Sequence, residues 1–232
     1  AVGAGRYKTD ALTLNVATFN GQTYKRAPGS TAKPILDYGP AIEYENLSTY
    51  GPFIDEKTTY GGSYMRDFNA GFKGFMSTRD CLKNSINTCA LQAFRLTTME
   101  QKVEFAKNLG FTFENDWIPE SYSIGTFNEA TPVKIAAAYS AFGNGGYYTA
   151  PYSFTKLVYR ETDEVYETDV NRKRVMKPTT AYMITSILVN ATNYRVKVSG
   201  TQIATKTGTT SYDTDYLKKF GLTSNVIPDA WT

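Results

Sequence analysis

The sequence predicts an α+β fold with several short helices and fewer strands. Four segments begin at a capping residue or an early proline and continue with apolar residues at helical spacing. Aromatic and β-branched residues fill 152–159 and 165–168, which is typical of strands. The chain has 232 residues, of which 41% are hydrophobic and 20% charged, so it can bury a sizeable core. We therefore expect one domain over residues 1–232.

Helix signals cover much of the middle of the chain. A capping box at 77–80 opens a helix that runs toward Ser85. Thr97 and Glu100 repeat this device, and the apolar stripe after them stops at 109–110. Two further helices are expected, one from Thr131-Pro132 to Gly143 and one from Lys177-Pro178 through Leu188.

The expected strands are short. A Tyr-rich and Gly-rich stretch, 58–75, is predicted to be a loop packed by its own aromatic rings, with the lining of a cleft as the alternative. The predicted strands are 152–159 and 165–168, paired as a hairpin across 162–164, then 202–209, and 12–19.

The most informative segment reads Pro-Gly-Ser-Thr-Ala-Lys, in a chain without histidine. On a helix, Ser30 and Lys33 lie one turn apart on one face, so the amine can approach the hydroxyl. Without histidine a Ser-His-Asp triad is excluded, and an activated serine must give its proton to a lysine or a carboxylate. The alternative is an ordinary helix start with a solvated lysine.

The surroundings of this segment favour an activated serine. The first turn of a helix carries free N–H groups and a partial positive charge, which favour negative charge near Ser30. The same field and burial would lower the pKa of Lys33 toward that of a usable base. Pro34 is a complication, because it cannot donate to the carbonyl of Ser30 and would strain a regular turn.

The pattern S-x-x-K occurs a second time, at Ser153 to Lys156, within the predicted strand 152–159. Residues three apart on a strand point to opposite faces, so this serine and lysine cannot meet.

Two further short motifs follow the first S-x-x-K. Ser85-Ile86-Asn87 is the only S-x-N of the chain, and Lys206-Thr207-Gly208 is its only K-T-G. Taken alone, the former suits a helix cap or turn and the latter an ordinary strand end. Together and in this order, the three motifs resemble the signature of penicillin-binding proteins and class A β-lactamases.

The resemblance extends over nearly the whole chain. Four segments look like the transpeptidase domain of class A, bifunctional penicillin-binding proteins, in the serine β-lactamase and D,D-peptidase superfamily: PGSTAKPILDYGPAIE at 28–43, STRDCLKNSINTCA at 77–90, AAAYSAFGNGG at 136–146 and ATKTGTT at 204–210. Unlike class A β-lactamases, the chain has S-I-N in place of S-D-N and no E-x-x-L-N segment. That difference favours a slow acyl-enzyme with penicillins over their hydrolysis.

The resemblance implies an antiparallel sheet flanked by helices, a mainly helical subdomain, and an active site between them. Similar proteins continue past Asp229-Ala230-Trp231 with further strands, and their domain begins before Ala1. We therefore expect a domain that is incomplete at both ends, with an open sheet edge. The long stretch 211–228 would reshape one wall of the cleft.

The resemblance also implies roles for the motif residues. Ser30 would attack the carbonyl of a penultimate D-alanine or a β-lactam, and Lys33 would take its proton. Ser85 would relay a proton to the leaving amine. Asn87 would hold Lys33 and the substrate amide.

The K-T-G segment would hold the substrate. Lys206 would add positive charge to the cleft, and Thr207 and Thr209 would offer hydroxyls to the substrate carboxylate. Gly208 would let the strand approach closely. The backbone N–H groups of Ser30 and Thr209 would form the oxyanion hole.

The implied function is a peptidoglycan D,D-transpeptidase that forms stem-peptide cross-links and is inhibited by β-lactams. The alternatives are a D,D-carboxypeptidase, a β-lactamase, and a non-catalytic β-lactam sensor or wall-binding module. The resemblance further implies a parent protein anchored in the bacterial cytoplasmic membrane, with a glycosyltransferase domain and with this domain on the extracytoplasmic face. No cofactor or metal is expected.

The remaining features are less specific. A net charge of +3 is too mild to indicate nucleic acid binding, and the basic run 171–174 is expected to be a solvated turn. No apolar run reaches the roughly 18 residues that a membrane span needs. Cys81 and Cys89 flank the S-x-N motif and are expected to be free, buried thiols, with a disulfide as the alternative.

Overall fold

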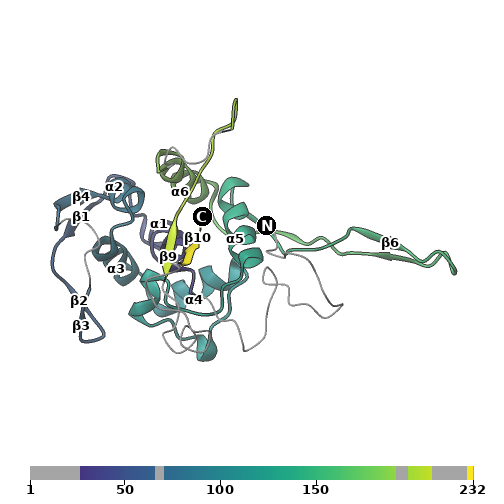
Figure 1. Ribbon diagram of the computed structural model, residues 1–232, viewed down its shortest axis with the longest axis horizontal. Coiled ribbons are helices and arrows are strands. Elements are labelled where there is room, and N and C mark those ends of the chain that lie inside the picture. The colour runs from purple at the N-terminus through teal and green to yellow at the C-terminus, as the bar shows by residue number, and fades with distance from the viewer. Residues whose placement is uncertain (1–26, 66–70, 192–197, 211–228, 232) are drawn as a thin grey trace, which may run out of the picture.

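The computed structural model describes residues 27–65, 71–191, 198–210 and 229–231 (Figure 1). The described helices are α1 (Gly39–Glu45), α2 (Thr78–Lys83), α3 (Asn87–Leu96), α4 (Met99–Asn108), α5 (Pro132–Gly143) and α6 (Pro178–Asn190). Short turns of 3₁₀ helix lie at η1 (Gly29–Ala32), η3 (Glu114–Asp116) and η4 (Glu120–Ile124), and η2 (Pro34–Tyr38) is a π-helical turn.

The strands of the described part form antiparallel pairs. β1 (Pro52–Asp55) pairs with β4 (Gly74–Ser77), and β2 (Thr59–Tyr60) pairs with β3 (Ser63–Tyr64). β5 (Tyr147–Thr149) pairs with β8 (Arg172–Arg174), β6 (Lys156–Val158) with β7 (Val165–Glu167), and β9 (Gly208–Thr210) with β10 (Asp229–Trp231). Helices and antiparallel strands together confirm the predicted α+β class.

The core surrounds η2, which contacts α1, α3 and α4, while α6 contacts α1, α2 and α5. The segment that carries S-x-x-K is therefore central to the fold, because η2 follows it directly. Fully buried apolar side chains from these helices fill the core, among them Ile35, Leu36, Leu82, Ala90, Phe105 and Ile184.

The predicted helix starts are confirmed with one exception. Ser77 caps α2 by accepting a hydrogen bond from the Asp80 N–H, and Thr131 caps α5. The box predicted at Thr97 and Glu100 is wrong, because it is formed one residue later by Thr98 and Gln101. Thr97 instead ends α3 and donates its hydroxyl proton to the carbonyl of Phe94.

The 152–168 hairpin is confirmed, although its paired strands are shorter than predicted. β6 and β7 form a two-stranded arm that extends away from the helical body (Figure 1). The second S-x-x-K lies at its base, with Ser153 and Lys156 both exposed.

Two loop predictions are wrong. Residues 171–174 are exposed as predicted, but 172–174 form strand β8 instead of a turn: they pair with β5, and Arg172 and Arg174 lie over the ring of Tyr147 on that strand. In the 58–75 stretch, described apart from 66–70, β2 and β3 form a small hairpin, and Tyr64 is 65% exposed rather than packed inward. At its end, Lys73 and Phe75 border an open surface hollow beside α2.

Other predictions concern the ends of the chain. The K-T-G strand is predicted to start at 202, but β9 starts at Gly208, where its pairing with Trp231 of β10 begins, so Lys206 and Thr207 precede the strand. The strand predicted at 12–19 lies outside the described residues. No helix among the described residues has the length and apolar character to cross a membrane.

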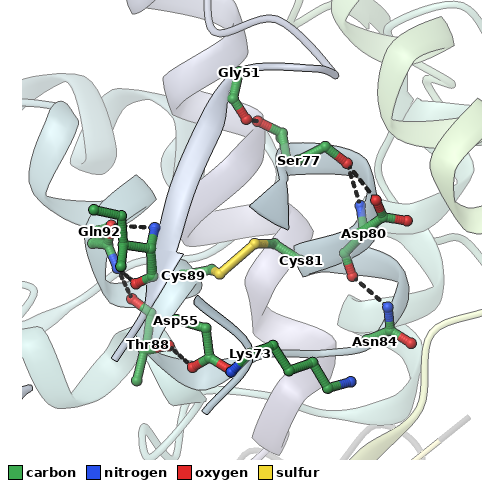
Figure 2. Close-up of a disulfide and its surroundings, with 12 residues drawn as sticks. Gly51, Asp55, Lys73, Ser77, Asp80, Cys81, Asn84, Thr88, Cys89 and Gln92 are labelled. Carbon is green, nitrogen blue, oxygen red and sulfur yellow. Dashed lines mark hydrogen bonds between the residues drawn. A yellow bond between two sulfur atoms is a disulfide. The ribbon is translucent and has the colours of Figure 1, made fainter. Parts of the chain in front are cut away.

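The prediction of two free thiols is wrong. Cys81 on α2 and Cys89 on α3 form a disulfide, and both side chains are fully buried (Figure 2). The burial was predicted correctly. The pairing depends on how the two helices cross, with a Cα to Cα distance of 5.9 Å, which lies in the range that a disulfide can span.

Candidate active site

Three glycines bring Ser30 against the K-T-G strand. Gly29, in the left-handed region at a φ of 56°, lies so close to β9 that an added Cβ would be 2.5 Å from the Thr209 carbonyl oxygen. A Cβ on Gly208 would lie 2.4 Å from the carbonyl oxygen of Pro28. On the other side, the Gly29 N–H donates to the carbonyl of Gly125, which follows η4. Backbone therefore packs on backbone on two sides of the serine.

Pro34 is accommodated by a change of helix type. The Ser30 carbonyl accepts from the Lys33 N–H in a 3₁₀ turn, so it does not need the N–H that Pro34 lacks. The Pro34 carbonyl then accepts from the Gly39 N–H in the π-helical turn η2. The strain expected at this proline is thus relieved on both sides of it.

The Lys33 amine is fully buried and points at the S-x-N turn. Its Nζ lies 2.6 Å from the carbonyl oxygen of Ser85, 2.7 Å from Asn87 Oδ1 and 3.3 Å from Ser85 Oγ. Within the described part of the chain, none of its hydrogen bonds goes to Ser30. Carbonyl and amide oxygens have taken the place of the hydroxyl that helical spacing suggested as its partner.

The S-x-N turn joins α2 to α3 and is tightly constrained. Ser85 has a φ of 58°, which is uncommon for a residue with a side chain. Its N–H donates to Leu82, and the N–H of the next residue, Ile86, donates to Cys81. This conformation turns both the carbonyl and the hydroxyl of Ser85 toward Lys33.

Lys206 completes the cluster from the strand side. Its Nζ donates to Ser85 Oγ at 2.7 Å and to the carbonyl of Thr207 at 2.9 Å. Ser85 Oγ therefore lies between two lysines that are 173 residues apart in sequence (206 minus 33). Thr207 and Thr209 are exposed and Gly208 is buried, which matches the alternation of a strand whose buried face meets η1.

Burial sets the charge state of the two lysines. Desolvation, then repulsion by Lys206, holds the pKa of Lys33 well below its ordinary value, while Asp37 opposes the shift. Desolvation lowers the pKa of Lys206 to about 8. The lowered pKa favours the neutral form of Lys33, while Lys206, with a pKa of about 8, is mostly charged at neutral pH.

Sequence reasoning missed two residues near this cluster. Asp37 is fully buried one turn after Lys33, and neither of its carboxylate oxygens has a hydrogen-bond partner among the described residues. Desolvation raises the pKa of Asp37, and Lys33 and Lys102 oppose this shift. The spacing from Lys33 to Asp37 was the signal that could have found it.

Tyr139 is the second missed residue. Its hydroxyl donates to the carbonyl of Thr31 at 2.9 Å and so ties α5 to η1. No local pattern marks it, because the contact spans 108 residues.

Comparison with known proteins agrees with this geometry. The family described as penicillin binding protein transpeptidase domain matches residues 7–221. The chain belongs to this family. The predicted resemblance to class A penicillin-binding proteins is confirmed by a relative in Bacillus subtilis (strain 168), penicillin-binding protein 1A/1B. The two sequences are 38% identical over 240 residues, which cover 100% of this chain and 26% of the relative.

A second relative and one solved structure show the same family and fold. Penicillin-binding protein 1A of Streptococcus pneumoniae (strain ATCC BAA-255 / R6) is 31% identical over 214 residues, covering 87% of this chain and 30% of the relative. The D,D-transpeptidase domain of a peptidoglycan glycosyltransferase from Eggerthella lenta superposes with a TM-score of 0.71 at 18% identity, covering 88% of this chain and 58% of that one. The chain thus spans between a quarter and a third of the curated relatives' length.

Proposed function

We propose that this domain is a serine D-Ala-D-Ala transpeptidase, which joins peptidoglycan stem peptides through an ester on Ser30 and is acylated there by β-lactams. One observation carries the proposal: the Lys33 amine is buried, desolvated and held by Ser85 and Asn87, one turn from Ser30. Family membership supports it.

The hydrogen bonds of Lys33 suit a base. A neutral amine has two N–H donors and one lone pair. The two short bonds, to the Ser85 carbonyl at 2.6 Å and to Asn87 at 2.7 Å, use both donors. The lone pair is then left for a hydroxyl proton, from Ser30 during attack or from Ser85 afterwards.

Acylation follows from this arrangement. Ser30 Oγ bonds to the carbonyl carbon of the penultimate D-alanine as Lys33 takes its proton. The C–N bond to the terminal D-alanine breaks, and the proton passes through Ser85 to the leaving amine. Lys206, on the far side of Ser85 Oγ, would keep that hydroxyl oriented and would attract the substrate carboxylate.

Deacylation completes the cross-link. An acceptor amine from a second stem peptide attacks the ester, its proton passes to Lys33, and Ser30 Oγ leaves with a proton. The backbone N–H groups of Ser30 and Thr209 would stabilise the oxyanion in both steps. A lost donor of this kind typically costs about 3 kcal/mol of barrier lowering. Thr207 and Thr209 are exposed on the K-T-G segment, which packs against Gly29, and would bind the substrate carboxylate.

The context of the reaction is also proposed. The relatives are three to four times longer than this chain, which supports a parent protein with further domains. We infer a glycosyltransferase domain and a membrane anchor, with this domain outside the cytoplasmic membrane.

Labelled penicillin tests the proposal. Mass spectrometry of the treated protein should show one adduct on Ser30, absent in the Ser30→Ala variant and present in Ser153→Ala. Rapid release of hydrolysed drug would indicate a β-lactamase. If the intact protein formed no adduct, the acylating functions would be excluded and a non-catalytic binding module would remain. A cross-linking assay with lipid-linked glycan then separates a transpeptidase from a carboxypeptidase, which releases D-alanine without cross-links, and from a sensor, which does neither.

A further inference from the structure

The Cys81–Cys89 disulfide encloses the turn that holds Lys33. Cys81 lies four residues before Ser85, and Cys89 lies two residues after Asn87. The Cys81 carbonyl accepts from the Ile86 N–H at 2.9 Å, so the same residue fixes the turn through its backbone and its side chain. We propose that Cys81 and Cys89 are positioning residues for acylation, a role that rests on the function proposed above.

The two helices are each anchored without the disulfide (Figure 2). Ser77 and Asp80 cap α2, and the Thr78 hydroxyl donates to the carbonyl of Gly51. On α3, the Thr88 hydroxyl donates to Asp55, whose other oxygen accepts from the Lys73 N–H. Loss of the disulfide should therefore leave both helices in place.

Among the described residues, the side chains of Ser85 and Asn87 have no such anchor, although the backbone N–H of Ser85 donates to the carbonyl of Leu82 at the end of α2. Ser85 is in the left-handed region, which costs about 1–2 kcal/mol for a residue with a side chain. Its side chain and carbonyl face two lysines, and no described hydrogen bond from Ser85 or Asn87 side chains reaches α2 or β1. The covalent link shortens the path over which this turn can relax.

The consequence is a redox dependence of acylation. Reduction by dithiothreitol cleaves the S–S bond, gives each sulfur one electron and one proton, and converts the reagent to its cyclic disulfide. Ser85 and Asn87 can then move away from Lys33. A displacement of about 1 Å in a catalytic group costs on the order of 100-fold in rate. Water reaching Lys33 would also raise its pKa toward the ordinary lysine value.

The test compares oxidised and reduced protein. The rate of Ser30 acylation by fluorescent penicillin is measured across pH in both forms, with thiol labelling under denaturing conditions to count free cysteines. We expect no free thiols before reduction, a rate about 10-fold to 100-fold lower after it, and an acid limb moved to higher pH. The Cys81→Ala, Cys89→Ala double variant should have the acylation rate and pH profile of the reduced protein, and dithiothreitol should change neither.

Controls separate positioning from general stability. Val175→Ala removes buried methyl groups from the residue after β8, whose N–H bonds to the carbonyl of Gly146, and should lower the melting temperature without changing the pH profile. Equal rates and pH profiles in oxidised and reduced protein would overturn the positioning role alone, as would two free thiols in air-purified protein of full activity. Absence of any Ser30 adduct in the oxidised form would instead overturn the proposed function.

Discussion

Lys33 and Asn87 are joined by a 2.7 Å hydrogen bond from the lysine amine to the amide oxygen, across 54 residues of sequence. The bond connects the helix that follows Ser30 to the first residue of α3. It fixes one of the two protons of a neutral Lys33 amine, and so determines where its lone pair points.

Replacing Asn87 by alanine should slow acylation of Ser30 by about 10-fold to 100-fold, because hydrogen bonds to charged or polarised groups contribute roughly 1.5–3 kcal/mol. The rate is measured with fluorescent penicillin. Asn84→Ala is the matched control, since its amide lies on the same turn but donates to the carbonyl of Asp80. Equal rates in both variants would show that Asn87 does not hold the base.

The pH profile of acylation should be bell-shaped. Lys33, with its lowered pKa, acts as a base when neutral, so the rate rises with pH on the acid side. Lys206 is charged below its pKa of about 8 and neutral above it, so the rate falls as pH rises past that value. In Lys206→Arg the charge persists and the alkaline limb should disappear. If the rate of this variant still fell above about pH 8, the alkaline limb would belong to a group other than Lys206.

Asp37→Asn should move the acid limb to lower pH. Asp37 raises the pKa of Lys33 against the effect of burial, so its removal lowers the pH at which the amine becomes neutral. Asp116→Asn breaks an exposed pair with Lys107 and should leave the profile where it is. A shift of the limb toward higher pH would contradict the assigned sign.

Gly29→Ala should destabilise the domain by about 2–5 kcal/mol, from the left-handed conformation and the clash with β9 together. Gly61→Ala is the control, because Gly61 has a similar φ of 52°, against 56° for Gly29, but no atom lies within 4 Å of its added Cβ. It should cost about 1–2 kcal/mol. Urea denaturation measures the free energy of unfolding of both variants. Equal losses of stability would mean that β9 can move to make room for the methyl group.

The local features of the fold could be predicted from sequence. Ser77 and Thr131 cap helices where their side chains and the following residues require it, and 152–168 forms a hairpin because its residues suit exposed strands. The failures have local causes too. Thr98 caps α4 in place of Thr97, because the Thr97 hydroxyl donates to the carbonyl of Phe94 at the end of α3.

The sequence by itself determined which chemical groups the site contains: an alcohol and an amine one turn apart, no imidazole, and a K-T-G segment. Only the tertiary structure decided that Lys33 bonds to Ser85 and Asn87, that Lys206 reaches Ser85 across 121 residues, that Asp37 is buried, and that Cys81 and Cys89 are paired. Caps and turns depend on neighbours within a few residues. These other contacts depend on how distant helices and strands pack around η2. That packing sets the distances between the side chains, and it excludes the water whose loss lowers the pKa of both lysines.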